Sequence, residues 1–224
     1  MAAKWFHQKA GRAKPWYEKD GRARLAADKA LVVESYPVLA FRVDEDLELV
    51  YLEGTLAIDS GCGIATLVET KLVFPRDYPH SEPAAYDAAP RFKAYAEKDI
   101  KDRHLSSDGK CCLWLPPCSP WSAGDPNALR DFLDQLVVFW DRQLIYDDTG
   151  KWPGPAYLHD QDGYLQFVAE QFGGDVKLAG VLAPLVLGRL FVGRNQYCPC
   201  GSHRKFKLCH LWKVEEIRRR VARR

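Results

Sequence analysis

No part of the sequence offers a long uninterrupted apolar run, which excludes an ordinary membrane-spanning helix. Every window falls short of the roughly 18 consecutive apolar residues that such a helix needs. The most apolar segment, residues 178–192, is interrupted by Pro184 and Arg189, and we expect a pair of buried or amphipathic helices there. Residues 1–19 contain cations but no apolar centre, so a secretory signal is not expected. The resulting prediction is a cytoplasmic protein with no membrane partner.

The sequence also lacks the even cysteine count of a disulfide framework. Its seven cysteines stand at positions 62, 111, 112, 118, 198, 200 and 209. An odd number without a signal peptide favours metal binding and reactive thiols over structural disulfides. A G-x-x-x-x-G-K-[ST] loop is absent as well, so any ATP-dependent step would belong to another protein.

Charge is present but unevenly distributed. The net charge is +2, yet residues 1–30 carry eight Lys/Arg against three Asp/Glu and residues 194–224 carry ten against two. The acidic middle, residues 31–193, holds 14 Lys/Arg and 25 Asp/Glu. With 47% hydrophobic residues a real core can form, so the basic ends flank a folded body. They either keep the protein in solution or bind an acidic partner, for which nucleic acid is the less favoured candidate.

The end of the chain carries a metal-binding pattern, Cys198-x-Cys200 followed by Cys209-His210. The first pair can approach one ion from a tight turn, and the second pair can reach it from the start of a helix. Zinc prefers four thiolate or imidazole ligands in a tetrahedron. A 31-residue tail has no core in which to bury unrelated cysteines, and a segment this short needs a bound metal to stabilise its fold. We expect His203, inside the loop, to be solvated.

The same stretch, C-x-C-G-S-x-x-K-x-K-x-C-H, closely resembles the SEC-C motif, a small zinc module of bacterial proteins. The resemblance implies a structural zinc held by Cys198, Cys200, Cys209 and His210, and a docking role without chemistry of its own. Residues 211–224 extend the module as a basic helix with Leu211, Val214 and Ile217 predicted on one side.

Strand and helix patterns predict an α+β domain in the middle of the chain. Residues 127–146 repeat apolar positions at helical spacing, with Asp125-Pro126 as the expected cap and first-turn proline. Residues 74–83 contain three prolines and therefore form neither a helix nor a central strand. The remaining expected elements are a helix at 23–34 and antiparallel strands at 36–43, 47–58 and 63–74.

A reactive thiol is predicted between the proline segment and the long helix. Cys111 and Cys112 follow a Ser-Ser-Asp-Gly turn in a stretch rich in tryptophan and proline, which favours an irregular surface ledge over a core. A thiol in such a position can be reached by a large thioester.

Residues 24–150 as a whole resemble the ubiquitin-conjugating enzyme (UBC) fold. A helix, an antiparallel four-strand meander, the Phe74-Pro75 segment, the G-x-x-C-L pattern ending at Leu113, Trp121 and a crossing helix occur in the family's order. The resemblance implies that Cys112 forms the thioester and that Cys111 takes a buried aliphatic position. It divides the chain into a basic extension (1–22), a UBC-like domain with a helical extension (23–193) and the zinc module with its helix (194–224).

The chain departs from the family at the asparagine that supports the oxyanion, where it carries His104. An imidazole there would donate to an oxyanion or deprotonate an amine, or it would only pin the loop. Asp147 and Asp148 stand near the family's acceptor-orienting acid, although a plain helix-ending loop explains them equally well. His159 either faces the thiol or is structural. A second metal could in principle be held by His104, Cys111, Cys112 and Cys118, but their spacing matches no common zinc site and such a metal is disfavoured.

The resemblance implies an enzyme that accepts a protein C-terminus from an activating enzyme and transfers it to an amine of a target protein. The cargo would be a ubiquitin-like protein or the C-terminus of a cGAS-like nucleotidyltransferase, in a bacterial antiviral conjugation system. The alternative is an inactive UBC-fold scaffold that docks partners through the SEC-C module. No cofactor other than structural zinc is expected.

Overall fold

The computed structural model describes residues 15–19, 21–59, 61, 65–89, 91–92 and 102–222. Over these residues the protein is a mixed α+β structure with two separate hydrophobic clusters, one around a sheet and one among C-terminal helices. Most of the expected N-terminal extension, 1–22, lies outside the described residues, as does Cys62.

A four-stranded antiparallel sheet forms the first half of the protein, which confirms the predicted meander. The strands lie in the order β1-β2-β3-β4, so each one pairs with its neighbour in sequence. Alternate residues of β2, Val50 and Leu52 among them, are buried because every second side chain of a strand faces the same side. The strands are β1 (Leu39–Asp44), β2 (Leu49–Asp59), β3 (Ala65–Phe74) and β4 (Ala84–Asp87).

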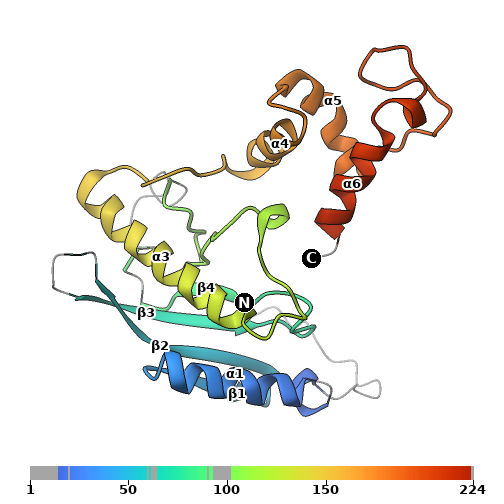
Figure 1. Cartoon of the computed structure of the whole chain (residues 1–224). Coiled ribbons are helices and arrows are strands. Elements are labelled where there is room, and N and C mark those ends of the chain that lie inside the picture. The colour runs from blue at the N-terminus through green and yellow to red at the C-terminus, as the bar shows by residue number, and fades with distance from the viewer. Residues whose placement is uncertain are drawn as a thin grey trace, which may run out of the picture.

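Two helices pack against this sheet (Figure 1). The helix α1 (Arg22–Ser35) contacts β1 and α3, while α3 (Ala128–Thr149) crosses the sheet and contacts β2. Leu136 and Trp140 of α3 are fully buried in one cluster with Phe74 of β3. Both helices lie where the sequence predicts them, with ends shifted by no more than three residues.

The start of α3 corrects the predicted cap. The N-cap is Asn127, so Pro126 precedes the helix instead of occupying its first turn. The Asp125 carboxylate accepts a hydrogen bond from the Asn127 amide at 2.8 Å, because an aspartate side chain readily closes a turn onto the amide two residues on. At the other end, Gly150 adopts the left-handed conformation (φ +66°) and its amide donates to the Tyr146 carbonyl.

The second hydrophobic cluster joins the helical extension to the C-terminal module (Figure 1). It contains α4 (Asp160–Gln171), α5 (Val176–Val186) and α6 (Leu211–Ala222). Val214 and Ile217 of α6 are buried and Leu211 packs against them, which confirms the predicted apolar side of this helix. Three short 3₁₀ turns complete the described elements: η1 (Trp16–Glu18), η2 (Pro116–Cys118) and η3 (Phe206–Leu208).

The expected helix pair at residues 178–192 is wrong, because that segment contributes a single helix. Pro184 is accommodated near the end of α5, and the chain turns after Val186, where the amides of Arg189 and Leu190 both donate to the Pro184 carbonyl. Gly188 adopts the left-handed conformation (φ +70°) just after the helix end, which turns the chain away from a helical path. No helix within the described ranges is both long and apolar enough to cross a bilayer.

Candidate active-site cleft and metal cluster

The segment that carries the predicted thiol is a tight hairpin docked on the edge of the sheet. The Cys111 amide donates to the Ala85 carbonyl of β4 at 2.8 Å, and the Asp87 amide donates to the Gly109 carbonyl at 2.9 Å. Within the hairpin the Cys112 amide donates to the His104 carbonyl at 2.8 Å. The hairpin 104–112 therefore extends the sheet beyond β4 and holds Cys112 opposite His104 (residues 104–112 lie on the green trace of Figure 1).

Strand-like alternation in this hairpin separates the two adjacent thiols. Cys111 is 8% exposed and belongs to the core around the sheet, whereas Cys112 is exposed. Burial raises the pKa of the Cys111 thiol well above its ordinary value, with smaller contributions from Asp87 and Cys112. Cys111 thus occupies a core position, and Cys112 is the thiol of this pair that a large substrate can reach. Its nucleophilic role stays a prediction.

His104 lies in the left-handed backbone region, with φ +55°. Burial lowers the pKa of its imidazole to about 4, and the positive charges of His159 and Arg142 act in the same direction. The ring is flanked by His159 and Trp152, each with a centroid distance of 4.7 Å. At neutral pH His104 is therefore an uncharged imidazole that can donate one N–H.

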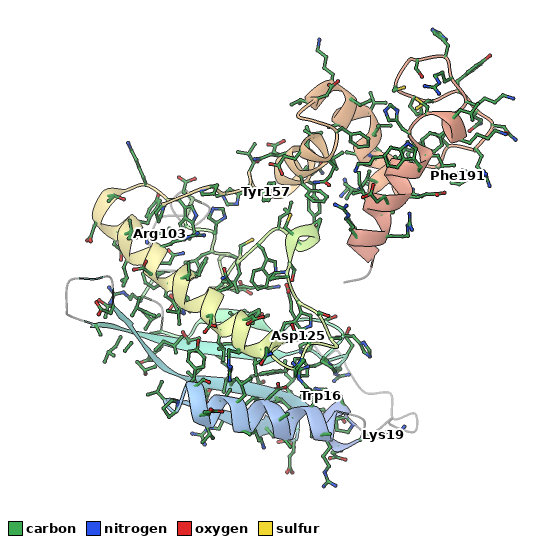
Figure 2. All side chains as sticks on the ribbon, in the orientation of Figure 1. Trp16, Lys19, Arg103, Asp125, Tyr157 and Phe191 are labelled. Carbon is green, nitrogen blue, oxygen red and sulfur yellow. The ribbon has the colours of Figure 1, made fainter. Side chains whose placement is uncertain are left out.

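Arg103 fixes the backbone beside His104. The Arg103 side chain is buried, stacks over the Tyr146 ring at 4.4 Å and pairs with Asp147 at 2.6 Å. Its carbonyl accepts a hydrogen bond from the Gln143 amide at 2.5 Å. Three residues of one face of α3 thus hold Arg103, which Figure 2 labels beside that helix. The sequence did not indicate a role for Arg103, because a buried arginine leaves no local sequence pattern.

The acidic pair at the end of α3 does not reach the thiol. The carboxylate of Asp147 is engaged by Arg103, and Asp148 is exposed. Neither aspartate belongs to the wall of the cleft that contains Cys112. Their predicted role toward an acceptor amine stays untested by this geometry.

A cleft of about 990 Å³ opens beside Cys112. It is bounded by the hairpin on one side and by the connection from α3 to α4 on the other, which includes Tyr157 (labelled in Figure 2). His104, His159 and Cys118 share this cleft with Cys112. The remaining wall residues are Leu105, Ser106, Ser107, Lys110, Cys111, Leu113, Trp114, Leu115, Arg142, Trp152, Pro155, Ala156, Tyr157 and Leu158.

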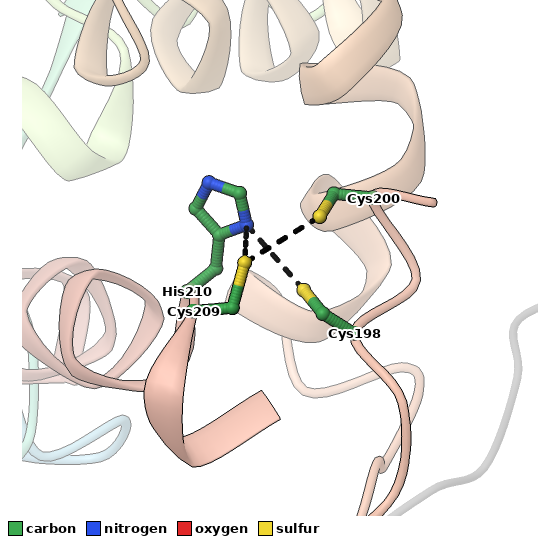
Figure 3. Close-up of side chains that lie close together, drawn as sticks. All are labelled: Cys198, Cys200, Cys209 and His210. Atoms are coloured by element: carbon green, nitrogen blue, oxygen red, sulfur yellow. Dashed lines mark hydrogen bonds between the residues drawn. The ribbon is translucent and has the colours of Figure 1, made fainter. Parts of the chain in front are cut away.

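The predicted zinc ligands meet in one cluster in the C-terminal module (Figure 3). Cys198, Cys200, Cys209 and His210 place their ligand atoms within 4.8 Å of one another. Among the residues that the structure describes, this is the one group of three or more such side chains close enough to share an ion. Sequence reasoning therefore identified all four members of the cluster.

The distances within the cluster fit a tetrahedral zinc site. The Cys198 and Cys209 sulfurs each lie 3.4 Å from His210 Nδ1, and the Cys200 and Cys209 sulfurs are 3.6 Å apart. Zn–S and Zn–N bonds of ordinary length at tetrahedral angles require edges of about 3.6 Å (S···N) and about 3.8 Å (S···S). The donor set and the spacing thus suit a zinc ion.

Local backbone structure supports the cluster. The Cys198 amide donates to the Arg204 carbonyl, and Gly201 takes φ +79°, which lets the loop turn back. Phe206 is buried in the second hydrophobic cluster, and the His210 ring lies edge-on to Phe172 beyond α4 at a centroid distance of 5.7 Å. The ligands are therefore held against α4 and α5 as well as within their own loop.

Comparisons with known proteins identify a sequence motif and a likeness to solved structures. Residues 194–211 match the SEC-C motif, and all four cluster residues lie inside that range. Among solved structures, the crystal structure of the yeast vps23 UEV domain in complex with a vps27 PSDP peptide matches 54% of this chain and 81% of that chain. The sequence identity is 15% and the TM-score is 0.39.

Proposed function

We propose that the protein is a thioester-forming acyl carrier, which accepts a protein C-terminus on Cys112 and passes it to an amine. The observation that carries the proposal is the docked hairpin, which buries Cys111 and leaves Cys112 exposed in a cleft opposite an uncharged His104. The order of helix, four-strand meander, cysteine segment and crossing helix supports a UBC-like scaffold for it.

The chemistry requires little beyond these groups. In the first step the Cys112 thiolate attacks the carbonyl carbon of a donor thioester, a new C–S bond forms, and the donor's thiolate leaves. In the second step an amine attacks the acyl carbon, the Cys112 sulfur leaves as a thiolate, and the amine proton passes to solvent. Both steps proceed through an oxyanion, to which the neutral His104 N–H can donate.

The partners follow from the same proposal. An activating enzyme supplies the donor thioester, and a target protein supplies the amine. The cargo is a ubiquitin-like protein or the C-terminus of a cGAS-like nucleotidyltransferase, in an antiviral conjugation system. The C-terminal cluster holds a structural zinc, which fixes a docking module and takes no part in the transfer.

A transthiolation assay on the full zinc-loaded chain tests the proposal. The probe is an acetylated peptide ending in Gly-Gly as a mercaptoethanesulfonate thioester, and intact mass reports the adduct. We expect a reductant-sensitive adduct that Cys112→Ser abolishes and the matched Cys118→Ser retains, since both residues line the cleft. Acylation of Cys112 no faster than of Cys118, and no discharge onto added lysine, would favour the inactive scaffold instead.

Substitutions of His104 and Asp147 extend the same assay to the residues around the thiol. His104→Ala should slow acyl transfer by about a hundredfold, whereas His104→Asn should restore much of the rate because an amide also donates to an oxyanion. We propose that Asp147 acts through Arg103 on the placement of His104. Asp147→Asn should then slow transfer and shift the His104 imidazole resonances, while the matched Asp148→Asn changes neither.

A further inference from the structure

The cleft beside Cys112 is lined by cationic and neutral groups. Its ionisable wall residues are two histidines, three cysteines, a tyrosine, Lys110 and Arg142, and no carboxylate belongs to the described wall. The chain's acidic middle makes this local excess of positive charge unexpected, since residues 31–193 carry 25 Asp/Glu.

Both cations line the cleft that contains the thiol, Lys110 from the hairpin and Arg142 from α3. Lys110 and Cys112 are exposed on either side of buried Cys111, so the alternation of the hairpin directs them to the same face. Arg142 comes from α3, and its guanidinium lies near Gly154, 3.9 Å from the position that a Cβ would take there. Neither side chain forms an ion pair with any described residue.

Three carboxylates on the surrounding elements already have partners. Asp108, in the turn of the hairpin, accepts from the Ser106 hydroxyl and the Lys110 amide. Asp147 pairs with Arg103, and Glu170 accepts from the Tyr157 hydroxyl at 2.5 Å. Asp102 is exposed, and its negative charge raises the pKa of His104, whereas Arg142 lowers it. The pKa of His104 is nevertheless lowered to about 4, mainly by burial. The cleft thus keeps its positive charge.

We infer, on the premise of the acyl-carrier function proposed above, that the C-terminal tail delivered to Cys112 carries carboxylate side chains just before its terminal glycine. Lys110 and Arg142 bind these carboxylates while the glycine carbonyl meets the thiol. Lys and Arg are the natural partners of a carboxylate, and hydrogen bonds between such charged groups are stronger than those between neutral groups.

The size and wall of the cleft favour a peptide tail as its occupant. Its volume of about 990 Å³ suits several residues of extended chain, whereas an acceptor amine needs only the space at the thiol. Trp152, Leu115 and Leu158 give an apolar wall beside the two cations, so the tail can hold an apolar residue between its acidic ones.

Charging the full zinc-loaded chain with three peptide thioesters tests the inference. The peptides are Ac-Glu-Leu-Glu-Gly-Gly, Ac-Gln-Leu-Gln-Gly-Gly and Ac-Arg-Leu-Arg-Gly-Gly, each as a mercaptoethanesulfonate thioester. Arginine supplies the positive charge because its guanidinium is not an acceptor amine, and no other amine is added. At low salt we expect Cys112 to react about tenfold faster with the acidic peptide than with the basic one. In 1 M salt the ratio should approach one, because the Debye length falls to about 3 Å.

Charge-reversal variants assign the selectivity to residues. Lys110→Glu and Arg142→Glu should each lower the acidic-to-basic ratio, and the two together should invert it. Lys177→Glu and Arg189→Glu change the net charge equally on exposed residues outside the cleft and should leave the ratio unchanged. The ratio of the two rates is measured because a general loss of reactivity cancels in it. Since Lys110 is exposed, its charge can be reversed without disturbing the core.

The outcomes separate this inference from the function on which it rests. Equal rates for the three peptides, a preference for the basic one, or a preference that survives both reversals would overturn the acidic tail while leaving the acyl carrier standing. If none of the thioesters acylates Cys112, the acyl-carrier proposal fails, and the inference fails with it.

Discussion

The two hydrophobic clusters of this protein are stabilised in different ways. The cluster around the sheet is closed by large apolar side chains, with Phe74, Phe92 and Trp140 fully buried. The C-terminal cluster has no buried side chain larger than phenylalanine among its described members, and three of its contributors, Cys198, Cys200 and Cys209, belong to the candidate metal cluster. From this comparison we expect one half to fold by apolar burial alone and the other half to depend on a bound ion.

The largest expected effect is that of metal removal, which should destabilise the C-terminal half and leave the sheet half folded. Zinc-finger peptides gain about 10–16 kcal/mol from their metal, which equals or exceeds the whole stability of a typical domain. Chelation, or the substitution Cys209→Ala, is expected to abolish hydrogen-exchange protection of α6 together with α4 and α5. Protection in β2, β3 and α3 should persist.

Judged from the sequence alone, in which a 31-residue tail has no core of its own, chelation would unfold residues 194–224 only. The structure extends this effect, because Arg218 of α6 donates to the Leu185 carbonyl of α5 at 2.6 Å and His210 contacts Phe172. Loss of protection confined to residues 194–222 would show that α4 and α5 fold without the metal. Elemental analysis that finds no zinc in the purified protein would remove the basis of the comparison.

Truncating one buried leucine in each cluster should have an effect of intermediate size and should show whether the two clusters are stabilised independently. Leu136 lies in the sheet cluster and Leu182 in the C-terminal cluster, and both are 0% exposed. Each change to alanine should destabilise its own half by about 2–5 kcal/mol. Because folding and metal binding are coupled, Leu182→Ala should weaken zinc affinity by one to a few orders of magnitude, about tenfold for each 1.4 kcal/mol.

The matched change Leu136→Ala should leave zinc affinity unchanged. Competition with a chromophoric chelator measures both affinities, and circular dichroism of the zinc-loaded chains measures the unfolding transitions. Equal losses of zinc affinity in the two variants would mean that the clusters fold as one cooperative unit.

The smallest expected effect is that of acid on the sheet half. Protonation of His104 at low pH should lower the free energy of unfolding of that half. The pKa of His104 is about 4 when folded and 6.5 in the unfolded chain, so the unfolded state binds more protons between these values. The free energy of unfolding should therefore fall as the pH drops from 6.5 toward 4, and this contribution should be constant above 6.5. Since water partly screens the ring, we expect a loss of about 2 kcal/mol.

Hydrogen exchange of β2 and β3 amides at pH 6.5 and pH 4.5 can measure this loss apart from acid release of zinc. His104→Asn should remove the slope. An identical pH dependence in both proteins would contradict the low pKa of His104.

The predictable features of the fold were those set by local pattern. The meander, α1, α3 and the apolar side of α6 follow from residues whose spacing alone indicates strand or helix. The expected helix pair at 178–192 failed because α5 continues through Pro184 to Val186 and the chain then turns at Gly188, which has φ +70°.

The sequence by itself determined which four donors form the candidate metal cluster, because C-x-C followed by Cys-His brings them together within one short loop. It also marked out Cys112 as the candidate nucleophile, by the order of motifs around it. Only the tertiary structure decided that Arg103 is held by α3, that Arg142 reaches the cleft from α3, and that α4 and α5 pack with the metal module. These contacts join residues far apart in the chain, and the energy of such pairs depends on burial and distance, which no local pattern records.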